Sequence, residues 1–140
     1  MNAVNYHHLS EQAIRSWFIA MSDSVQERDI ESHMENVSKR VQVYGMPSKG
    51  VIGYHEWKAR RYHEFFHDEL LALNYSGIRI IRSSNKRISF ATTETMVGNQ
   101  GKLVILDKTI VLEYEDDGVW RSIEETVNKW RVKQLDLKKF

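Results

Sequence analysis

The second half of this 140-residue chain consists of four β-rich blocks separated by short turns, and this pattern limits the possible folds most strongly. Isoleucine, valine, threonine and aromatic residues dominate each block, which is typical of strands. The separators SSNK, GNQG and DDG have the composition of tight hairpin turns. Because short turns join antiparallel neighbours, the sequence predicts a four-strand meander over residues 71–82, 87–97, 102–115 and 119–135.

The first half has the periodicity of helices around one early strand. We expect Ser10 to cap a first helix whose apolar face contains Ile14, Trp17, Phe18, Met21 and Val25. Asp29 is expected to cap a second, short helix, with His33 on its apolar side as a hydrogen-bonded core residue. A strand over residues 40–44, a glycine-rich loop over 45–53 and a third helix over 54–70 follow.

Helices first and a long meander afterwards predict an α+β fold. The strands are long for so small a chain, so we expect a strongly curved, mostly antiparallel sheet that curls over three N-terminal helices. At 140 residues with no visible linker, residues 1–140 are expected to form a single domain.

Composition argues against several classes of protein. The formal net charge of +1 gives no broad positive field, so we expect no nucleic-acid binding. The chain has no cysteine, which excludes disulfides and thiol chemistry within it. We find no secretory signal and no apolar run of membrane-spanning length, so we expect a cytoplasmic protein without membrane attachment. No motif indicates a cofactor, and none is expected.

One motif suggests metal chemistry. Residues 63–67 read H-E-x-x-H, a pattern in which two histidines of a metalloprotease helix bind zinc. On a helical wheel His63 and His67 lie outside the apolar side, which holds Tyr54, Trp57, Ala59, Tyr62, Phe65, Phe66 and Leu70. A catalytic zinc needs a third protein ligand and a pocket that excludes water. We therefore predict an exposed helix face and no metal site.

A sheet that curls over helices favours a cavity at its open end, and polar residues inside strands are candidates for its wall. Side chains alternate along a strand, so Glu94 shares a face with Phe90 and Met96. By the same alternation, and without a bulge, Glu124 shares a face with Trp120 and Trp130. A carboxylate held in a pocket would have a raised pKa and could transfer protons, whereas one on the outer face would pair with lysine or arginine.

Aromatic residues are numerous enough to line such a cavity, although most of them are expected in the core. The full set is Trp17, Phe18, Tyr44, Trp57, Phe65, Phe90, Trp120 and Trp130.

Several short motifs occur in an order that resembles nuclear transport factor 2-like domains. They are Trp17-Phe18, Arg28-Asp29, Val43-Tyr44-Gly45-x-Pro47, Gly53-Tyr54-x-x-Trp57 and the closing hairpin from Glu115 to Arg121. The resemblance covers about residues 10–135 and implies a cone-shaped, cystatin-like α+β fold. It also implies a homodimer that packs sheet against sheet, and a hydrophobic cavity in each subunit.

This superfamily includes ketosteroid isomerases, SnoaL-like polyketide cyclases and non-enzymatic binding modules, so the fold leaves the function open. The isomerases' catalytic positions fall near Trp17, near Tyr44 and Gly45, and near Ile110 and Val111, none of which supplies the required group.

Three functions stay open. The first is a small-molecule-binding domain with a cavity lined by Trp17, Tyr44, Trp57 and Phe90, in which Glu94 or Glu124 orients a small hydrophobic ligand. The second is an isomerase- or cyclase-type enzyme that uses Glu94 or Glu124 as general acid or base and Tyr44 as hydrogen-bond donor. The third is a regulatory module that binds a partner through its dimer surface.

Overall fold

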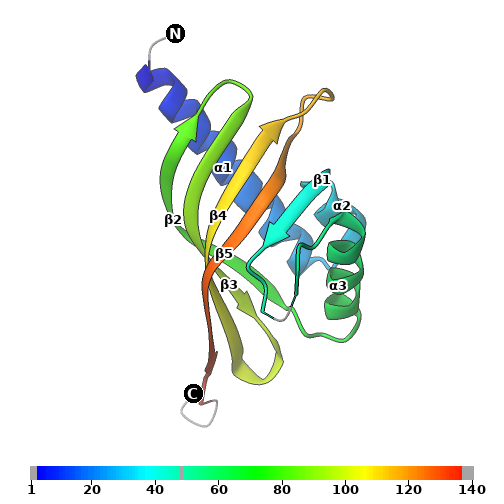
Figure 1. Ribbon diagram of the computed structural model, residues 1–140. Helices are drawn as coiled ribbons and strands as arrows, with labels where there is room; N and C mark the ends of the chain where they lie inside the picture. Colours follow the sequence, from blue (N-terminus) through cyan, green and yellow to red (C-terminus); the bar gives the residue numbers. More distant parts are fainter. Residues whose placement is uncertain (1–2, 48, 137–140) are drawn as a thin grey trace.

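A curved sheet encloses one helix along its length and a second helix at its edge in the computed structural model, which describes residues 3–47 and 49–136 (Figure 1). Ser48 of the predicted loop, and residues 1, 2 and 137–140 of the predicted domain, lie outside the described residues. The helices are α1 (Ala3–Gln26), α2 (Ile30–Met34) and α3 (Tyr54–Phe66). The strands are β1 (Val37–Tyr44), β2 (Ala72–Ser83), β3 (Arg87–Val97), β4 (Lys102–Tyr114) and β5 (Trp120–Gln134), with a 3₁₀ turn, η1 (Asn99–Gly101), between β3 and β4.

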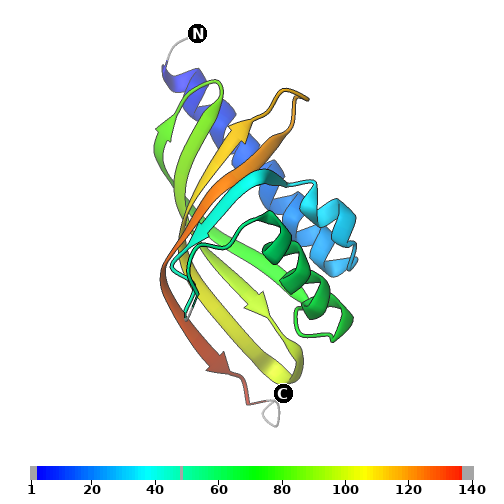
Figure 2. The same cartoon turned by 45° about the vertical axis from the view of Figure 1, so that its right-hand side comes forward.

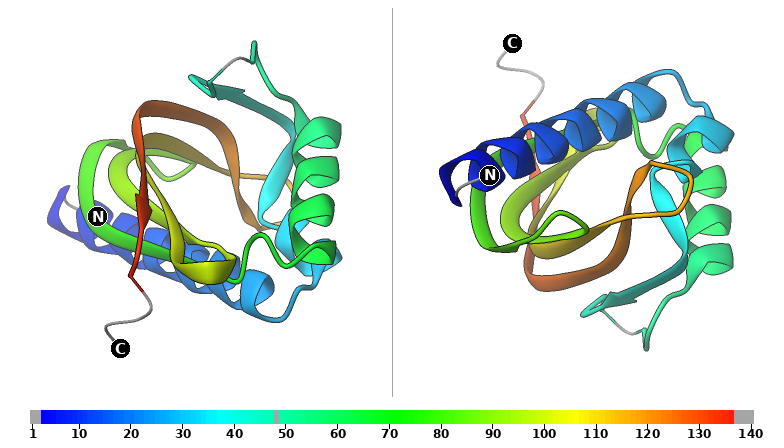
Figure 3. Two further views of the ribbon diagram at one scale, coloured as in Figure 1. Left: turned by 90° about the horizontal axis from the view of Figure 1, so that it is seen from below. Right: turned by 90° about the horizontal axis from the view of Figure 1, so that it is seen from above.

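The strand order in the sheet is β1-β5-β4-β3-β2. The strands β2 to β5 pair antiparallel with their chain neighbours, and β1 pairs parallel to β5. The predicted α+β fold with a curved, mostly antiparallel sheet is therefore confirmed. Figures 2 and 3 show the strands bending around α1 and α3, so that both helices lie on the concave side.

The core lies between α1 and the concave face of the sheet. Phe18 of α1 stacks on Tyr75 of β2 with ring centroids 4.3 Å apart, and Trp17 lies 5.6 Å from the same ring. Buried aliphatic and aromatic side chains complete this core, including Ile14, Met21, Val25, Phe90, Ile110 and Leu112. Burial of these apolar surfaces supplies most of the stability of such a fold.

The helix ends differ from the predictions in two places. Helix α1 begins at Ala3, so Ser10 does not cap it but lies buried within the helix, 3% exposed. Asp29 does cap α2, as predicted, and its carboxylate accepts the Ser32 N–H at 3.1 Å. Helix α3 ends at Phe66 rather than at residue 70, because Asp68 adopts a left-handed backbone conformation with φ of 57°.

The apolar side of α3 also differs from the predicted one. Its buried residues are Trp57, Arg61 and Phe65, whereas Tyr62 and Phe66 are exposed and stack on each other. The helical wheel placed the rings of Tyr62 and Phe66 inside, because it assigned buried positions to apolar residues only. A buried arginine rotates the inward face of the helix by about one residue, or 100°.

A bulge in β5 overturns the predicted orientation of Glu124. Leu112 pairs with Ser122 but Val111 pairs with Glu124, so Ile123 is an extra residue on β5. Alternation along the strand reverses at this point. Glu124 is therefore exposed, and Glu125 takes the interior position with 0% of its surface accessible.

Among the described residues, no helix is both long enough and apolar enough to cross a membrane.

Candidate functional site

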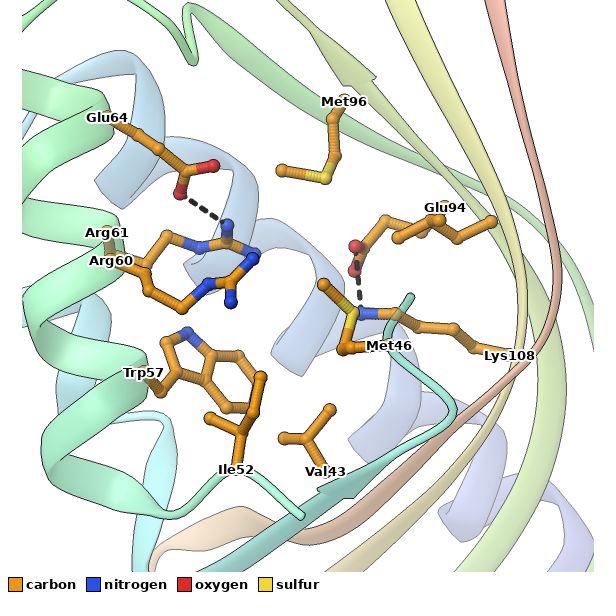
Figure 4. Close-up of a pocket in the computed structure, with 11 residues that line it drawn as sticks. Val43, Met46, Ile52, Trp57, Arg60, Arg61, Glu64, Glu94, Met96 and Lys108 are labelled. Atoms are coloured by element: carbon orange, nitrogen blue, oxygen red, sulfur yellow. Dashed lines mark hydrogen bonds and ion pairs between the residues drawn. The ribbon is translucent and has the colours of Figure 1, made fainter. Parts of the chain in front are cut away.

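A cavity of about 70 Å³ lies between α3 and the concave face of the sheet (Figure 4). Its lining combines apolar and charged side chains, and both α3 and the strands contribute each kind. The apolar residues are Val43, Met46, Ile52, Trp57, Met96 and Leu106, and the charged ones are Arg60, Arg61, Glu64, Glu94 and Lys108. Arg60, Glu64 and Met46 are partly exposed, so the cavity reaches the surface beside them. Figure 4 shows Trp57, Arg60 and Arg61 projecting from α3 toward Glu94 and Lys108.

The floor of the cavity is a buried ionic triad, formed by three neighbouring strands. Lys108 of β4 donates from Nζ to Glu94 of β3 and to Glu125 of β5, each at 2.9 Å. The lysine side chain is 5% exposed and each glutamate side chain 1%. Each glutamate sits diagonally across a strand pair from the lysine, within reach of its long side chain. Burial of three charges is tolerated because each is paired with an opposite one.

The two carboxyl groups of this triad have different proton affinities. Burial alone would raise the pKa of Glu94, but the positive charges of Lys108 and Arg61 outweigh it, so the pKa lies below its ordinary value. Burial also raises the pKa of Glu125, and the negative charge of Glu94 adds to this, so that pKa lies above its ordinary value. Glu125 Oε2 has no hydrogen-bond partner among the described residues. Glu125 is therefore the member of the triad that takes up a proton most readily.

A second network holds the guanidinium of Arg61 in place. Arg61 donates from Nε to His33 Nε2 at 3.3 Å and from NH1 to Glu64 Oε1 at 2.8 Å. Burial, and then the charge of Arg61, hold the pKa of His33 well below its usual range, so this imidazole is neutral. Ser24 donates its hydroxyl proton to the Met21 carbonyl, so the Nδ1–H of His33 donates to Ser24 Oγ at 2.9 Å. His33 is thus the hydrogen-bonded core histidine that the sequence predicted.

The structure brings only two of the predicted site residues to the cavity, namely Trp57 and Glu94. Trp17 and Phe90 lie in the core, where the Trp17 indole donates to the Asn36 carbonyl at 2.9 Å. The Tyr44 hydroxyl donates to Gln42 Oε1 at 2.7 Å and is not part of the cavity wall.

Sequence reasoning missed Arg60, Arg61, Lys108 and Glu125. One signal was available for Lys108, which alternates with Leu106, Ile110 and Leu112 on the inward face of its strand. Another was available for Arg61, which lies four residues from both Trp57 and Phe65 and so shares their helix face. No local signal identifies Glu125, because its orientation depends on the bulge.

The two histidines of the H-E-x-x-H pattern lie on the outside, as predicted, whereas Glu64 between them lines the cavity and pairs with Arg61. His63 and His67 are both exposed, and His63 Nε2 lies 3.5 Å from Glu69 Oε1. Within residues 3–47 and 49–136 no cluster of three potential metal-ligating side chains occurs. We expect zinc to bind only weakly to this histidine pair. A zinc titration that gives tight one-to-one binding, lost in His63→Ala/His67→Ala, would contradict this interpretation.

Solved structures share this fold at low sequence identity. Hexachlorocyclohexane dehydrochlorinase LinA-type3 from Novosphingobium barchaimii LL02 is 14% identical, with a TM-score of 0.66 over 94% of either chain. An NTF-2-like protein of unknown function from Shewanella oneidensis MR-1 is 15% identical, with a TM-score of 0.69 over 83% of this chain and 96% of the other. A protein with a cystatin-like fold from Nostoc punctiforme PCC 73102 is 14% identical, with a TM-score of 0.63 over 91% and 92%. No protein-family model and no curated protein matches the sequence. The chain thus has the nuclear transport factor 2-like fold that its motif order predicted.

Proposed function

We propose that this chain binds a small molecule in the cavity between α3 and the sheet. The observation that carries the proposal is the indole N–H of Trp57. It is buried at the cavity wall and has no hydrogen-bond partner among the described residues. Buried donors are almost always paired in native proteins, so a bound molecule or water is needed to accept this hydrogen bond. The other apolar side chains of the lining offer a surface for the carbon skeleton of a ligand.

The volume limits the size of the ligand. About 70 Å³ is well below the several hundred Å³ of a site for a drug-sized molecule. Only a ligand of a few non-hydrogen atoms fits the cavity as it stands, and a larger one requires Met46 and Met96 to rearrange. Methionine side chains are unbranched and change rotamer easily, so the cavity can enlarge most readily beside these two residues.

Protein NMR tests this proposal directly. The indole N–H signal of Trp57, assigned by its loss in Trp57→Phe, should shift in a saturable way when a suitable small compound is added. The indole signal of Trp130, whose residue is 47% exposed on β5, is the internal control and should not move. A varied panel of small apolar and polar compounds that leaves the Trp57 signal unchanged, at concentrations that would fill a site with a dissociation constant of about 1 mM, would refute the proposal.

An acid–base enzyme is the second candidate, and the buried triad favours it. Glu94 lines the cavity as a carboxylate, and Glu125, with its raised pKa, lies on the other side of the same lysine. Paired groups with separated pKa values are typical of sites that move protons. A compound that binds should then be converted by the wild-type protein and only bound by Glu94→Gln. Bound compounds that stay unchanged on prolonged incubation would contradict catalysis.

We also propose that two copies associate through the outer face of the sheet, as the family resemblance implies. Small or apolar side chains occupy part of this face, including Ala91, Thr93, Ile105, Thr109 and Val111. Sedimentation should give twice the mass of one chain, and Ile105→Lys should reduce it to the mass of one. A single-chain mass for the wild-type protein would exclude both this dimer and a regulatory role that depends on it.

A further inference from the structure

The lining of the cavity has three positive side chains, Arg60, Arg61 and Lys108, but only two negative ones, Glu64 and Glu94. This imbalance indicates the chemistry of the ligand. Lys108 is paired with Glu94 and Glu125, and Arg61 is paired with Glu64. Arg60 also lines the cavity, but it makes no hydrogen bond or ion pair with any residue that the structure describes. The lining therefore carries one positive charge in excess, because Glu125, the further partner of Lys108, is not among the lining residues, and Arg60 is the cation of the lining without a partner among the described residues.

Two more features indicate that Arg60 belongs to a binding site. Arg61 already donates to the His33 ring nitrogen Nε2 and to Glu64 Oε1, so these two acceptors are engaged and Arg60 is the arginine of the lining that is left to bind a ligand. The Trp57 indole, one turn earlier on the same face of α3, is a second unused donor, and its residue is only 6% exposed. A planar guanidinium and a neighbouring N–H together suit a planar acceptor with two oxygens.

The negative groups of the wall limit the charge of that acceptor. Glu64 and Glu94 both line the cavity, so a doubly charged anion such as phosphate would meet repulsion from two carboxylates. A singly charged carboxylate is matched by Arg60 alone. The apolar residues of the lining suit a carbon chain, and the volume of about 70 Å³ keeps this chain short.

We propose, on the basis of the proposed function, that the cavity binds a small monocarboxylate. Its carboxylate accepts hydrogen bonds from the Arg60 guanidinium and the Trp57 indole N–H, and its carbon chain packs on Met46 and Met96.

Propionate and propionamide form a matched pair for the test, because they share size and shape and differ in charge. The Trp57 indole signal is followed at constant ionic strength while sodium propionate replaces sodium chloride. Propionate should bind at least about ten-fold more tightly than propionamide, the difference expected for hydrogen bonds to a charged group. Arg60→Gln should weaken propionate binding by about the same factor and leave propionamide unchanged. Arg82→Gln, an exposed arginine on β2 away from the cavity, is the control and should change neither.

The outcomes separate this inference from the proposed function. Equal binding of propionate and propionamide, or undiminished propionate binding in Arg60→Gln, overturns the carboxylate inference but keeps the binding cavity. Binding of neutral compounds without binding of propionate also overturns the carboxylate inference and keeps the binding cavity. Arg60 is partly exposed and unpaired with described residues, so Arg60→Gln should fold, and circular dichroism of the variant confirms this before titration. A Trp57 signal that responds to no carboxylate and no neutral compound overturns both proposals.

Discussion

Replacing Lys108 by methionine tests the buried triad most sharply, because the apolar side chain keeps the length of lysine but removes its charge. Both glutamates bond the same Nζ, so their nearest oxygens lie within about 6 Å of each other. With an effective dielectric constant of about 20, two negative charges at that distance repel by about 3 kcal/mol. Lost hydrogen bonds add to this, so we expect a loss of about 3–5 kcal/mol in the free energy of unfolding near neutral pH.

The loss should depend on pH in a defined direction. Without the lysine, burial and mutual repulsion raise the folded-state pKa of Glu94 and Glu125 above their values in the unfolded chain. A group with a raised folded-state pKa stabilises the fold at pH values below its unfolded pKa, and this stabilisation is lost as the pH rises through the folded value. Lys108→Met should therefore be closest to wild type near pH 5 and least stable near pH 8.

Urea unfolding followed by tryptophan fluorescence measures both effects, with the free energy extrapolated linearly to water. Lys102→Met is the control, since Lys102 is exposed on the same strand and its loss should cost less than about 0.5 kcal/mol. Glu94→Gln/Lys108→Met/Glu125→Gln removes every charge of the triad and should recover part of the lost stability. A Lys108→Met variant that loses less than about 1 kcal/mol, or loses equally at pH 5 and pH 8, would refute the reasoning.

Two further perturbations test the network behind the site and the turn after β1. Because the pKa of His33 is depressed in the folded state, His33 contributes its full stabilisation of the fold at pH values above its ordinary pKa of 6.5. This stabilisation is lost as the pH falls toward the folded-state pKa. The free energy of unfolding of His33→Gln should therefore lie furthest below that of wild type above pH 6.5, and the difference should narrow between pH 6.5 and pH 5. A difference that stays constant with pH in urea unfolding would contradict this. Gly45→Ala should cost more than about 2 kcal/mol, because Gly45 has φ of 82° and an added Cβ would lie 2.2 Å from the carbonyl oxygen of Val127. Gly50→Ala, where nothing lies within 4 Å of the added atom, is its control, and equal melting temperatures for the two variants would show that the clash is relieved.

Local sequence patterns were sufficient to predict the elements of this fold. The alternating blocks and hairpin turns after residue 71 correspond to β2 through β5 within one or two residues at each end. Asp29 and the short apolar repeat after it correspond to α2. These predictions succeed because turn chemistry, capping and alternation depend on residues close together in the chain.

The same patterns predicted only part of the candidate site. Trp57 and Glu94 were identified from periodicity within one helix and one strand, and both line the cavity. Tyr44 and Glu124 were placed there by the same reasoning and lie elsewhere. The expected homodimer, the cytoplasmic location and the absence of a cofactor stay predictions.

The sequence by itself determined which segments are helices and strands and which face of most strands is buried. Only the tertiary structure decided that Glu125 rather than Glu124 meets Lys108, and that His33 and Glu64 are the partners of the buried Arg61. The physical reason is that a bulge depends on how two strands pair across the curved sheet, and a buried charge is tolerated only when partners from distant segments surround it. Neither condition can be seen in the residues immediately before and after the position concerned.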